Sequence, residues 1–383
     1  MNIGFVSDAI TSNVTGVGRY ARNIFNQFNQ MGFPPTLIDW RDKKSLEDIT
    51  GEKVKDPLII KNPWPITKNV LWHFSLLNRL SRQGNLPDIL FNPSQFVHPV
   101  GSVTTPMVYV VHDISFITYP ECHKKGKKQL FQLFFRRTLE KADHIVCVTH
   151  YTKEQLLRYF PVSSSRVTVI HEGVEPHFRQ IHNDQMRHDI RHRYQLPNQF
   201  LLYVGTIEPR KNLDQLLVAL HLMKDRISLP LIIAGKEGWL TQSLFKLHND
   251  LQLNDKVRFL GYVPDEDLPL LYNLATAFVY ISKDEGFGLP PLEAMSCGTP
   301  VVASKAGALP EVIGDAALFT DHTNPLEIGQ SLERICNDAA LRDELSQKGI
   351  ERASRYTWEN TAKSLLALFT GIIEKSNRNG KTT

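Results

Sequence analysis

The chain has 383 residues, which is more than one typical domain, so we expect two domains. Hydrophobic residues make up 42% of it and charged residues 22%, as in ordinary soluble globular proteins. The formal net charge of +4 is compatible with an anionic substrate or an anionic membrane surface, but it is too small to indicate a nucleic-acid partner.

The four cysteines (Cys122, Cys147, Cys297 and Cys336) are scattered and have no zinc-type spacing. This pattern predicts reduced thiols in a cytoplasmic protein. The opening MNIGFVSDAITSN lacks a basic region followed by an apolar one, so we expect no signal peptide. No run approaches the ~20 apolar residues that a membrane span needs.

Short apolar runs alternate with amphipathic stretches along the first half, which predicts strands alternating with helices. The predicted strands are Ile3–Val6, Thr36–Ile38, Ile89–Phe91, Met107–Val111, His144–Val148 and Val167–Ile170. A polar, histidine-rich stretch then follows HEGVEPHFRQ (171–180), where we place the interdomain linker.

The same alternation restarts in the second half. Its predicted strands are Phe200–Val204, Leu231–Ala234, Val257–Leu260, Ala277–Ile281, Val301–Ala303 and Ala317–Phe319. One long amphipathic helix is predicted from about Trp358 to Glu374. Two sets of about six strands indicate two doubly wound α/β sheets, with a ligand in the cleft where the carboxyl ends of the strands face each other.

Two signals fall at strand ends in the first half. TSNVTGVGRY (11–20) leads from the first strand into a helix, and its Gly16 and Gly18 would let the backbone approach an anion. A loop that only needs positive φ explains this glycine pair equally well. His112 and Asp113 end the strand MVYVV, where they can bind a polyol, although a histidine satisfied in the core is the alternative.

The second half carries stronger signals. In YVGTIEPRKN (203–212), Arg210 and Lys211 precede a helix for which Asn212 is a suitable N-cap, so the two cations can hold a diphosphate. In EGFGLPPLE (285–293), two glutamates flank a glycine loop and a proline-started helix. We expect Glu293 in the first turn of that helix, where the dipole alone would favour it, whereas Glu285 is better explained as a ligand of sugar hydroxyls.

Three further stretches have competing explanations. The histidines of HDIRH (188–192) have the i, i+4 spacing of a metal site but no third ligand, and capping explains DED (265–267) better than Mg²⁺ binding. KKGKKQLFQLFFRRTLEK (124–141) fits either an anionic lipid surface or a core helix with a solvated lysine face.

Taken together, these motifs closely resemble family 4 of the GT-B glycosyltransferases, which are retaining, metal-independent enzymes that use nucleotide sugars. The resemblance rests on GTIEPRKN, IIAGKEGW, FLGYVPDEDLPLLY and EGFGLPPLEAMSCGTPVVAS, and in the first half on TGVGRY and VVHDISFITYPE, which look like bacterial cell-surface polysaccharide members. It implies an acceptor-binding domain over 1–175, completed by the helix 358–383, and a nucleotide-sugar domain over 176–357.

The resemblance also implies a role for each matching residue. Glu293 should bind the ribose, Arg210 and Lys211 should stabilise the leaving diphosphate, and Glu285 should stabilise charge at the anomeric carbon. His112 should bind the transferred sugar. The remaining donor-binding residues are expected to be Gly16, Val17, Gly18, Asp113, Thr206, Lys236, Tyr262, Val263, Gly286, Phe287, Gly288 and Leu289. Of these, Gly16 to Gly18 should close over either the phosphates or the acceptor.

The expected donor is a UDP-hexose such as UDP-glucose, with GDP-mannose as the alternative, and no cofactor or metal is expected. The expected acceptor is a glycan or a lipid-linked glycan, which would place the enzyme in the cytoplasm or at the inner face of the membrane. Two other classes remain as alternatives. One is a nucleotide-sugar 2-epimerase, which would need no acceptor, and the other is an inactive carbohydrate-binding relative.

Overall fold

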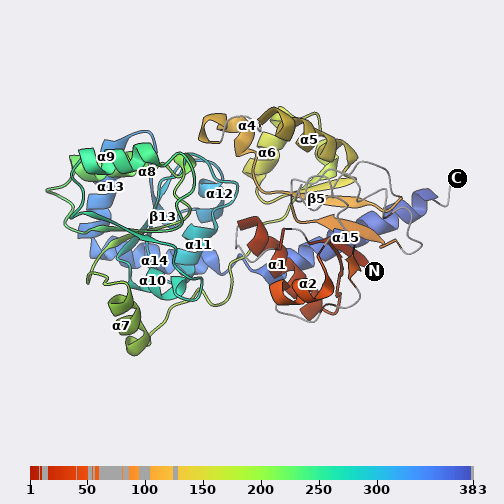
Figure 1. Cartoon of the computed structure of the whole chain (residues 1–383), viewed down its shortest axis with the longest axis horizontal. Helices are drawn as coiled ribbons and strands as arrows, with labels where there is room; N and C mark the ends of the chain where they lie inside the picture. The colour runs from red at the N-terminus through yellow and green to blue at the C-terminus, as the bar shows by residue number, and fades with distance from the viewer. Residues whose placement is uncertain are drawn as a thin grey trace. The chain divides into compact units, whose positions relative to one another are not determined.

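The computed structural model describes residues 1–7, 9–10, 16–39, 41–50, 54, 57–59, 80, 86–94, 104–123 and 128–380. The chain forms two compact units, which Figure 1 shows. Unit 1 comprises Met1–Ile114, Lys125–Gly173 and Trp358–Thr383. Unit 2 comprises Ser115–Lys124 and Val174–Thr357. Each unit has its own parallel sheet with helices packed against it.

The sheet of unit 1 has seven strands in the order β3-β2-β1-β4-β5-β6-β7, and every pairing in it is parallel. The strands are β1 (Ile3–Val6), β2 (Thr36–Asp39), β3 (Leu58–Ile59), β4 (Ile89–Asn92), β5 (Met107–Val111), β6 (His144–Cys147) and β7 (Val167–Val169). The strand order reverses between β1 and β4, which is the switch point of a doubly wound sheet.

The described helices of unit 1 cover both faces of this sheet. They are α1 (Gly16–Gln30), α2 (Lys43–Thr50), α5 (Lys128–Lys141), α6 (His150–Tyr159), the 3-10 turn η2 (Ser164–Arg166) and α15 (Trp358–Gly380). The C-terminal helix α15 lies against α1, because the ring of Phe369 packs 6.0 Å from that of Phe28 and 5.2 Å from that of Phe91. The last helix of the chain therefore completes the core of the first unit (Figure 1).

The sheet of unit 2 has six parallel strands in the order β10-β9-β8-β11-β12-β13. The strands are β8 (Leu201–Val204), β9 (Leu231–Ala234), β10 (Val257–Gly261), β11 (Ala277–Tyr280), β12 (Val301–Ser304) and β13 (Ala317–Thr320). Four of them are completely buried, as expected for a parallel sheet covered on both faces. Here the order reverses between β8 and β11.

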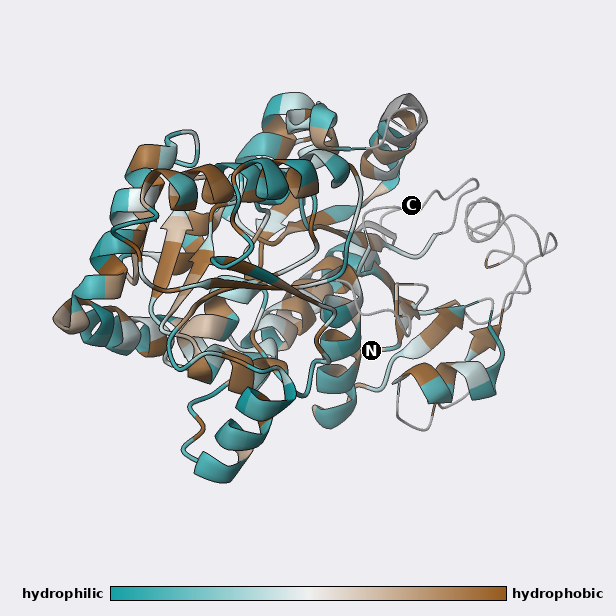
Figure 2. Cartoon of the chain, turned by 60° about the vertical axis from the view of Figure 1, so that its left-hand side comes forward, coloured by the Kyte–Doolittle hydropathy of each residue, from teal (hydrophilic) through white to brown (hydrophobic). Residues whose placement is uncertain are grey.

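The helices of unit 2 enclose that sheet. They are α4 (Ser115–Thr118), η1 (Pro120–Cys122), α7 (Asp184–Arg193), η3 (Pro209–Lys211), α8 (Leu213–Leu222), α9 (Gln242–Asp250), α10 (Leu268–Leu274), α11 (Leu289–Ser296), α12 (Leu309–Ile313), α13 (Pro325–Asn337) and α14 (Ala339–Ala353). Figure 2 shows apolar residues concentrated on the strands, whereas α7 is almost entirely hydrophilic. In the part of the chain that the structure describes, no helix is both long and apolar enough to span a bilayer.

The predicted fold class is confirmed, and every predicted strand is present with its ends displaced by at most one residue. One strand, β3, was not predicted, because a run of two residues has no detectable periodicity. The chain passes from unit 1 to unit 2 at Gly173–Val174, which lies within the predicted linker.

The segment Ser115–Lys124 belongs to unit 2, although the sequence expectation assigned it to the first domain. Trp239 donates its indole N–H to the Cys122 carbonyl at 2.7 Å. Thr118 donates its hydroxyl to Asp284 Oδ2 at 3.3 Å. A loop that follows a strand of one sheet can thus pack on the other unit, and the order of elements along the chain does not reveal this.

Part of the predicted basic stretch 124–141 lies outside the described residues, including its first four positions 124–127. Farther along α5, Phe135 and Leu139 are buried in unit 1, whereas Arg136 and Arg137 are exposed. The buried face of α5 supports the core-helix explanation for these positions, and the lipid-surface explanation stays a prediction.

Candidate functional site

The carboxyl edge of the unit 2 sheet begins with glycines that bring neighbouring loops together. Gly205 follows β8 and donates its N–H to the Ala234 carbonyl at 3.0 Å. Gly235 follows β9 and donates to the Gly261 carbonyl at 2.7 Å. A Cβ on Gly235 would lie only 1.8 Å from the Gly205 oxygen, so no other residue fits this approach. The loops after β8, β9 and β10 are therefore held side by side.

Four predicted donor-binding residues lie on these three loops. Thr206 and Lys236 are exposed, and the Lys236 ammonium lies 4.5 Å from the centre of the Tyr262 ring. Tyr262 is 54% exposed, whereas Val263 is buried. An exposed aromatic ring beside a cation can stack on a nucleotide base. Val263 is available to a ligand only through its backbone.

A charged cluster lies where β8 and β11 end, at the switch point of the sheet. Lys211 donates to Glu285 Oε1 at 2.6 Å, and Arg210 donates to Glu285 Oε2 at 2.9 Å. The Arg210 guanidinium also donates to the backbone carbonyl of Asp284 at 2.7 Å. The two oxygens of Glu285 are thus each held by a different cation, and the three predicted catalytic residues of unit 2 are in direct contact.

Two residues that sequence reasoning missed complete this cluster. Glu208 accepts from Arg210 at 3.0 Å, and the Tyr280 hydroxyl accepts from Lys211 at 2.8 Å. Glu208 stands within the quoted motif GTIEPRKN, so a search for counter-ions of Arg210 would have found it. Two cations and two carboxylates balance in charge, as burial requires.

Burial and charge together determine the protonation of the cluster. Burial by itself would raise the pKa of Glu285, but the charges of Arg210 and Lys211 and the Lys211 hydrogen bond lower it to about 2. Burial, followed by the charge of Arg210, lowers the pKa of Lys211 from its ordinary value. Glu285 is therefore ionised throughout the physiological pH range, and it is a weak base.

Asn212 occupies the predicted N-cap position of α8 but does not cap the helix with its side chain. Its backbone is left-handed, with φ of 60°, and its side-chain amide donates to the His322 carbonyl at 2.8 Å. The capping prediction was wrong because the tight 3-10 turn η3 leads directly into α8, and a left-handed residue joins the two.

The glycine loop 285–289 leads into α11 as the sequence indicated. Gly288 has φ of 107° and immediately precedes the helix, and Pro290 and Pro291 lie in its first turn. A Cβ on Gly288 would lie 2.7 Å from Leu309 Cδ2. The four predicted residues Gly286, Phe287, Gly288 and Leu289 therefore bring the N-terminus of a helix to the same edge as Glu285, where its dipole favours an anion.

Glu293 was predicted in the first turn of α11. It lies in the second turn, because the helix begins at Leu289. Its side chain is 1% exposed, and Oε2 accepts a hydrogen bond from the Tyr272 hydroxyl at 2.8 Å. The dipole of the first turn therefore does not explain this glutamate. A buried carboxylate bonded to a tyrosine is held in a fixed orientation.

Gly307 is a further residue that sequence reasoning missed. It follows β12 with φ of 59°, and a Cβ there would lie 2.4 Å from the Glu285 nitrogen. Its neighbour Ala308 donates its N–H to the Glu285 carbonyl at 2.8 Å. The loop after β12 thus fixes the backbone of Glu285. A glycine at the end of a predicted strand on the same edge was the available signal.

In unit 1 the predicted residues lie at the carboxyl end of β5 and at the start of α1. His112 and Asp113 directly follow β5, and His112 is buried. Gly16, Val17 and Gly18 form the first turn of α1, so the explanation as a positive-φ loop was wrong for these two glycines. The preceding positions 11–15 of the motif lie outside the described residues.

The two stretches considered as metal sites, HDIRH (188–192) and DED (265–267), make other contacts in the structure. His188 and His192 lie on exposed parts of α7 with their rings stacked 6.5 Å apart. Asp267 precedes α10, but instead of capping it accepts two hydrogen bonds from Arg193 and one from Tyr194. Over the described residues, no group of three potential ligands is placed to hold a metal ion.

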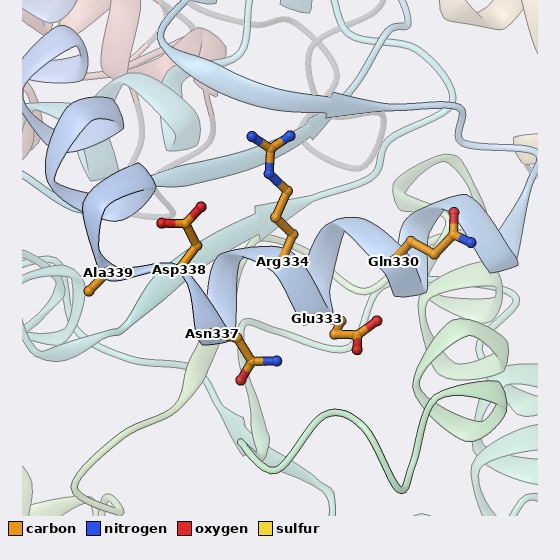
Figure 3. A pocket seen from close by; sticks show the side chains of 6 residues that line it. All are labelled: Gln330, Glu333, Arg334, Asn337, Asp338 and Ala339. Carbon is orange, nitrogen blue, oxygen red and sulfur yellow. The ribbon is translucent and has the colours of Figure 1, made fainter.

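A separate hollow of about 430 Å³ lies at the junction of α13 and α14, away from the sheet edge just described (Figure 3). Its lining residues are Gln330, Glu333, Arg334, Asn337, Asp338 and Ala339. None of the predicted site residues contributes to it. Figure 3 shows that its side chains come from α13 and from the short connection to the start of α14, so it lacks the converging loops of a substrate site.

Two doubly wound parallel sheets, one of them with cations, carboxylates and a helix N-terminus at its carboxyl edge, define the architecture of a GT-B glycosyltransferase. Comparison with known proteins agrees with this class. Residues 14–178 match the family model described as Glycosyltransferase Family 4, and residues 186–352 match the model described as Glycosyl transferases group 1. The chain belongs to the GT-B glycosyltransferases.

O-antigen chain mannosyltransferase B of Escherichia coli is 38% identical over 66% of this chain and 67% of its own length. The sucrose-phosphate synthase of Thermosynechococcus elongatus has a similar fold, with a TM-score of 0.78 at 20% identity over 98% of this chain and 100% of that one. Anabaena HepE, solved with UDP and glucose, has a TM-score of 0.76 at 18% identity over 97% and 99%. The prediction of a hexosyltransferase is thereby confirmed.

Proposed function

We propose that the chain transfers mannose from GDP-mannose to a glycan in bacterial polysaccharide synthesis, with retention of configuration and without a metal ion. The observation that carries this proposal is the cluster of Arg210, Lys211 and Glu285 at the switch point of unit 2. Mannose is preferred because the relative at 38% identity is named a mannosyltransferase. This reverses the order of the two donors that the sequence alone favoured.

The cluster can stabilise a leaving diphosphate. Arg210 and Lys211 are already neutralised by Glu285 and Glu208, so a bound diphosphate replaces carboxylate oxygens as the acceptor of their hydrogen bonds. The N-terminus of α11 adds partial positive charge at the same edge. Preorganised donors of this kind oppose the negative charge that builds up as the nucleoside diphosphate departs.

Glu285 is suited to electrostatic work and not to covalent attack. Its carboxylate is ionised, with a pKa of about 2, and each of its oxygens is held by a cation. A weak base in this environment is a poor nucleophile, whereas its negative charge favours an anomeric carbon that becomes positive. We infer a front-face displacement in which an oxygen of the leaving phosphate takes the proton of the acceptor hydroxyl.

Further residues are assigned to the remaining parts of the donor. Glu293 is assigned to the ribose hydroxyls, and the exposed ring of Tyr262 with Lys236 is assigned to the base. In unit 1, His112 is assigned to a hydroxyl of the transferred hexose. The acceptor is proposed to be a glycan or a lipid-linked glycan, and contact of 124–141 with an anionic membrane remains a prediction.

A panel of nucleotide sugars tests the donor. The thermal midpoint of the full chain is measured with GDP-mannose, GDP, UDP-glucose, UDP-galactose and UDP, since a ligand that binds the folded state raises that midpoint. We expect the largest rise with GDP-mannose and GDP. A larger rise with UDP-glucose and UDP would contradict the mannose proposal and restore the UDP-hexose alternative.

Transfer is then measured with a mannose-terminated oligosaccharide and the best donor, with and without EDTA. We expect product with an unchanged anomeric configuration by NMR and an unchanged rate in EDTA. Loss of turnover on chelation would contradict the metal-independent mechanism. Conversion of the donor sugar in the absence of any acceptor would instead indicate an epimerase, and absence of turnover with every donor would support the inactive relative.

A further inference from the structure

The carboxyl end of β5 in unit 1 carries a buried pair of ionisable side chains, His112 and Glu172. His112 is 8% exposed and Glu172 is 5% exposed. His112 Nδ1 lies 2.8 Å from Glu172 Oε1. Glu172 comes from the stretch that follows β7, one residue before unit 1 gives way to unit 2 at Gly173. Sequence analysis singled out His112 but not its partner.

The second ring nitrogen of His112 is also engaged. Nε2 lies 2.8 Å from the carbonyl oxygen of Pro93, which follows β4. Because a carbonyl can only accept, Nε2 carries a hydrogen, and a carboxylate at Nδ1 accepts a second one. The arrangement is therefore that of an imidazolium that donates from both nitrogens.

The packing around His112 fixes its ring. The buried Tyr20 ring from α1 packs against it in a T-shaped arrangement, with centroids 4.9 Å apart at 85°. The Thr152 hydroxyl from α6 donates to the His112 carbonyl at 3.4 Å. The residue after β4, helix α1 and the linker thus contact the imidazole itself, and α6 bonds the backbone of His112, which together limit the movement of the ring.

Three ionisable groups face the imidazole: Glu172 from the linker, Asp113 from its own strand end and Tyr20 from α1. Burial by itself would lower the pKa of His112. The opposing effects are larger, so the net shift is upward: they are the hydrogen bond and charge of Glu172, the hydrogen bond to the Pro93 carbonyl and the charge of Asp113. Burial, together with the Glu172 charge, raises the pKa of Tyr20 well above its ordinary value, so this phenol is neutral.

The backbone that carries Glu172 is itself held in place. Thr361 of α15 donates its hydroxyl to the His171 carbonyl at 2.8 Å. Just beyond, in unit 2, Val174 donates its N–H to the Tyr356 carbonyl at 3.1 Å and pairs with Thr357 in a parallel bridge. A carboxylate on a backbone anchored on both sides is a rigid support for the residue it contacts.

We propose that Glu172 is a positioning residue that keeps the His112 ring doubly protonated and fixed, so that Nε2–H serves as a donor to an oxygen of the transferred hexose. The inference rests on the proposed function. When the sugar binds, its hydroxyl oxygen shares or replaces the Pro93 carbonyl as the acceptor at Nε2. No covalent bond changes and no proton leaves the ring.

The test is Glu172→Gln, which keeps the size of the side chain and removes its charge. Without that charge the imidazolium is lost at lower pH, so we expect the alkaline limb of the kcat/KM profile to move down by about one pH unit. Glu172→Asp should restore part of the shift. Glu154→Gln, which removes an exposed acid from α6 of the same unit, is the matched control and should leave the profile unchanged.

A double-mutant cycle tests whether Glu172 acts through His112. We expect Glu172→Gln to add less than about twofold to the loss of kcat/KM already caused by His112→Gln, because the two substitutions remove one interaction. The proposal would be overturned if Glu172→Gln lowered kcat/KM by the same factor in the wild type and in the His112→Gln variant. An unshifted pH profile in active Glu172→Gln protein would also overturn it. Retained binding of the preferred nucleotide shows that unit 2 is intact in each variant.

A second measurement does not depend on turnover. Because the folded-state pKa of His112 is raised, its charged form stabilises the fold at low pH, and that stabilisation is lost as pH rises through the raised pKa. We expect the thermal midpoint of the wild type to fall with rising pH above about 6.5, and Glu172→Gln to lose this dependence. The same dependence in both proteins would overturn the pairing, whereas failure of every donor in the wild type would overturn the proposed function alone.

Discussion

The two sheets of the molecule have the same architecture and end in different chemistry. In both, the strand order reverses around the first strand, between β1 and β4 in unit 1 and between β8 and β11 in unit 2. At the carboxyl edge of unit 2, Arg210 and Lys211 meet Glu285. At the carboxyl edge of unit 1, His112 pairs with Glu172, and Arg41 pairs with the buried Asp39 at the end of β2.

This difference teaches that the fold determines where a site lies and the residues at the strand ends determine what it binds. Unit 2 supplies two cations and a helix N-terminus, which suit a diphosphate. In unit 1 the imidazole of His112 suits a hydroxyl oxygen, whereas the Arg41 guanidinium is bonded to Asp39 and to the carbonyls of Ser7 and Ile10. A diphosphate carries most of the charge of a nucleotide sugar, so substitutions in unit 2 are expected to have the larger effects.

The largest effect is expected for Lys211→Met, which keeps the length of the side chain and removes its charge. Removing one preorganised donor to a developing charge lowers kcat by about 10²–10³-fold. The comparison with unit 1 is sharpened by His112→Gln, for which we expect a loss at least about tenfold smaller. Steady-state transfer assays check both, and equal losses would contradict the division of roles between the units.

The next effect is expected for Glu285→Gln. Transfer should fall at least about tenfold because the negative charge near the anomeric carbon is gone, while nucleotide binding survives because Arg210 and Lys211 lose a competitor. Calorimetric titration with the preferred nucleoside diphosphate measures the second point. A variant with wild-type turnover would remove Glu285 from the mechanism.

The same substitution changes the acid stability of unit 2. The pKa of Glu285 is lowered from 4.5 to about 2, so its ionised form stabilises the fold above about pH 4.5, and this contribution is lost as pH falls toward 2. We expect thermal midpoints of wild type to drop more steeply than those of Glu285→Gln over that interval. Parallel curves would contradict the assigned coupling to Arg210 and Lys211.

A smaller effect on turnover is expected for Gly307→Ala, which acts on Glu285 through the backbone. Its new Cβ would lie 2.4 Å from the Glu285 nitrogen, and displacing that loop should lower kcat by about tenfold. Gly32→Ala in unit 1 is the matched control, since Gly32 also has positive φ but no atom lies within 4 Å of the position that a Cβ would take there. It should cost about 1 kcal/mol of stability and leave turnover unchanged.

Sequence patterns predicted most of the fold because parallel strands buried on both faces give continuous apolar runs, such as LLYV and LIIA, that end at polar loops. They also predicted the edge on which Arg210, Lys211 and Glu285 meet, since residues that follow parallel strands share one edge. The prediction failed where the contact depends on distant residues. Glu172 lies sixty positions from His112, and no local pattern joins them.

Position within a helix was the other source of error. Pro290 and Pro291 correctly indicated the start of α11, but the helix begins one residue earlier, at Leu289, and Glu293 therefore falls in the second turn. Similarly, Asn212 and Asp267 stand at helix starts as predicted, yet their side chains bond elsewhere, to the His322 carbonyl and to Arg193. Propensity locates a helix end, whereas tertiary contacts decide which partner its side chains take.

The smallest effect is expected for Tyr262→Ala. Its control is Tyr159→Ala, which removes a similarly exposed ring from unit 1. Tyr262 is 54% exposed with the Lys236 ammonium 4.5 Å from its centre, and Tyr159 is 46% exposed with the Arg158 guanidinium at 5.8 Å. Both substitutions should change stability by no more than about 0.5 kcal/mol, because neither ring is in a core.

Only Tyr262 lies on the edge assigned to the donor. Losing a stacking surface for the base should weaken nucleotide binding about fivefold in Tyr262→Ala and leave kcat nearly unchanged. Tyr159→Ala should bind nucleotide as the wild type does. Calorimetric dissociation constants for GDP and UDP measure this for both variants. Each of the two rings has a cation beside it, and only the Tyr262 ring lies on the edge assigned to the donor. Equal nucleotide affinities in the two variants would therefore mean that the base binds elsewhere.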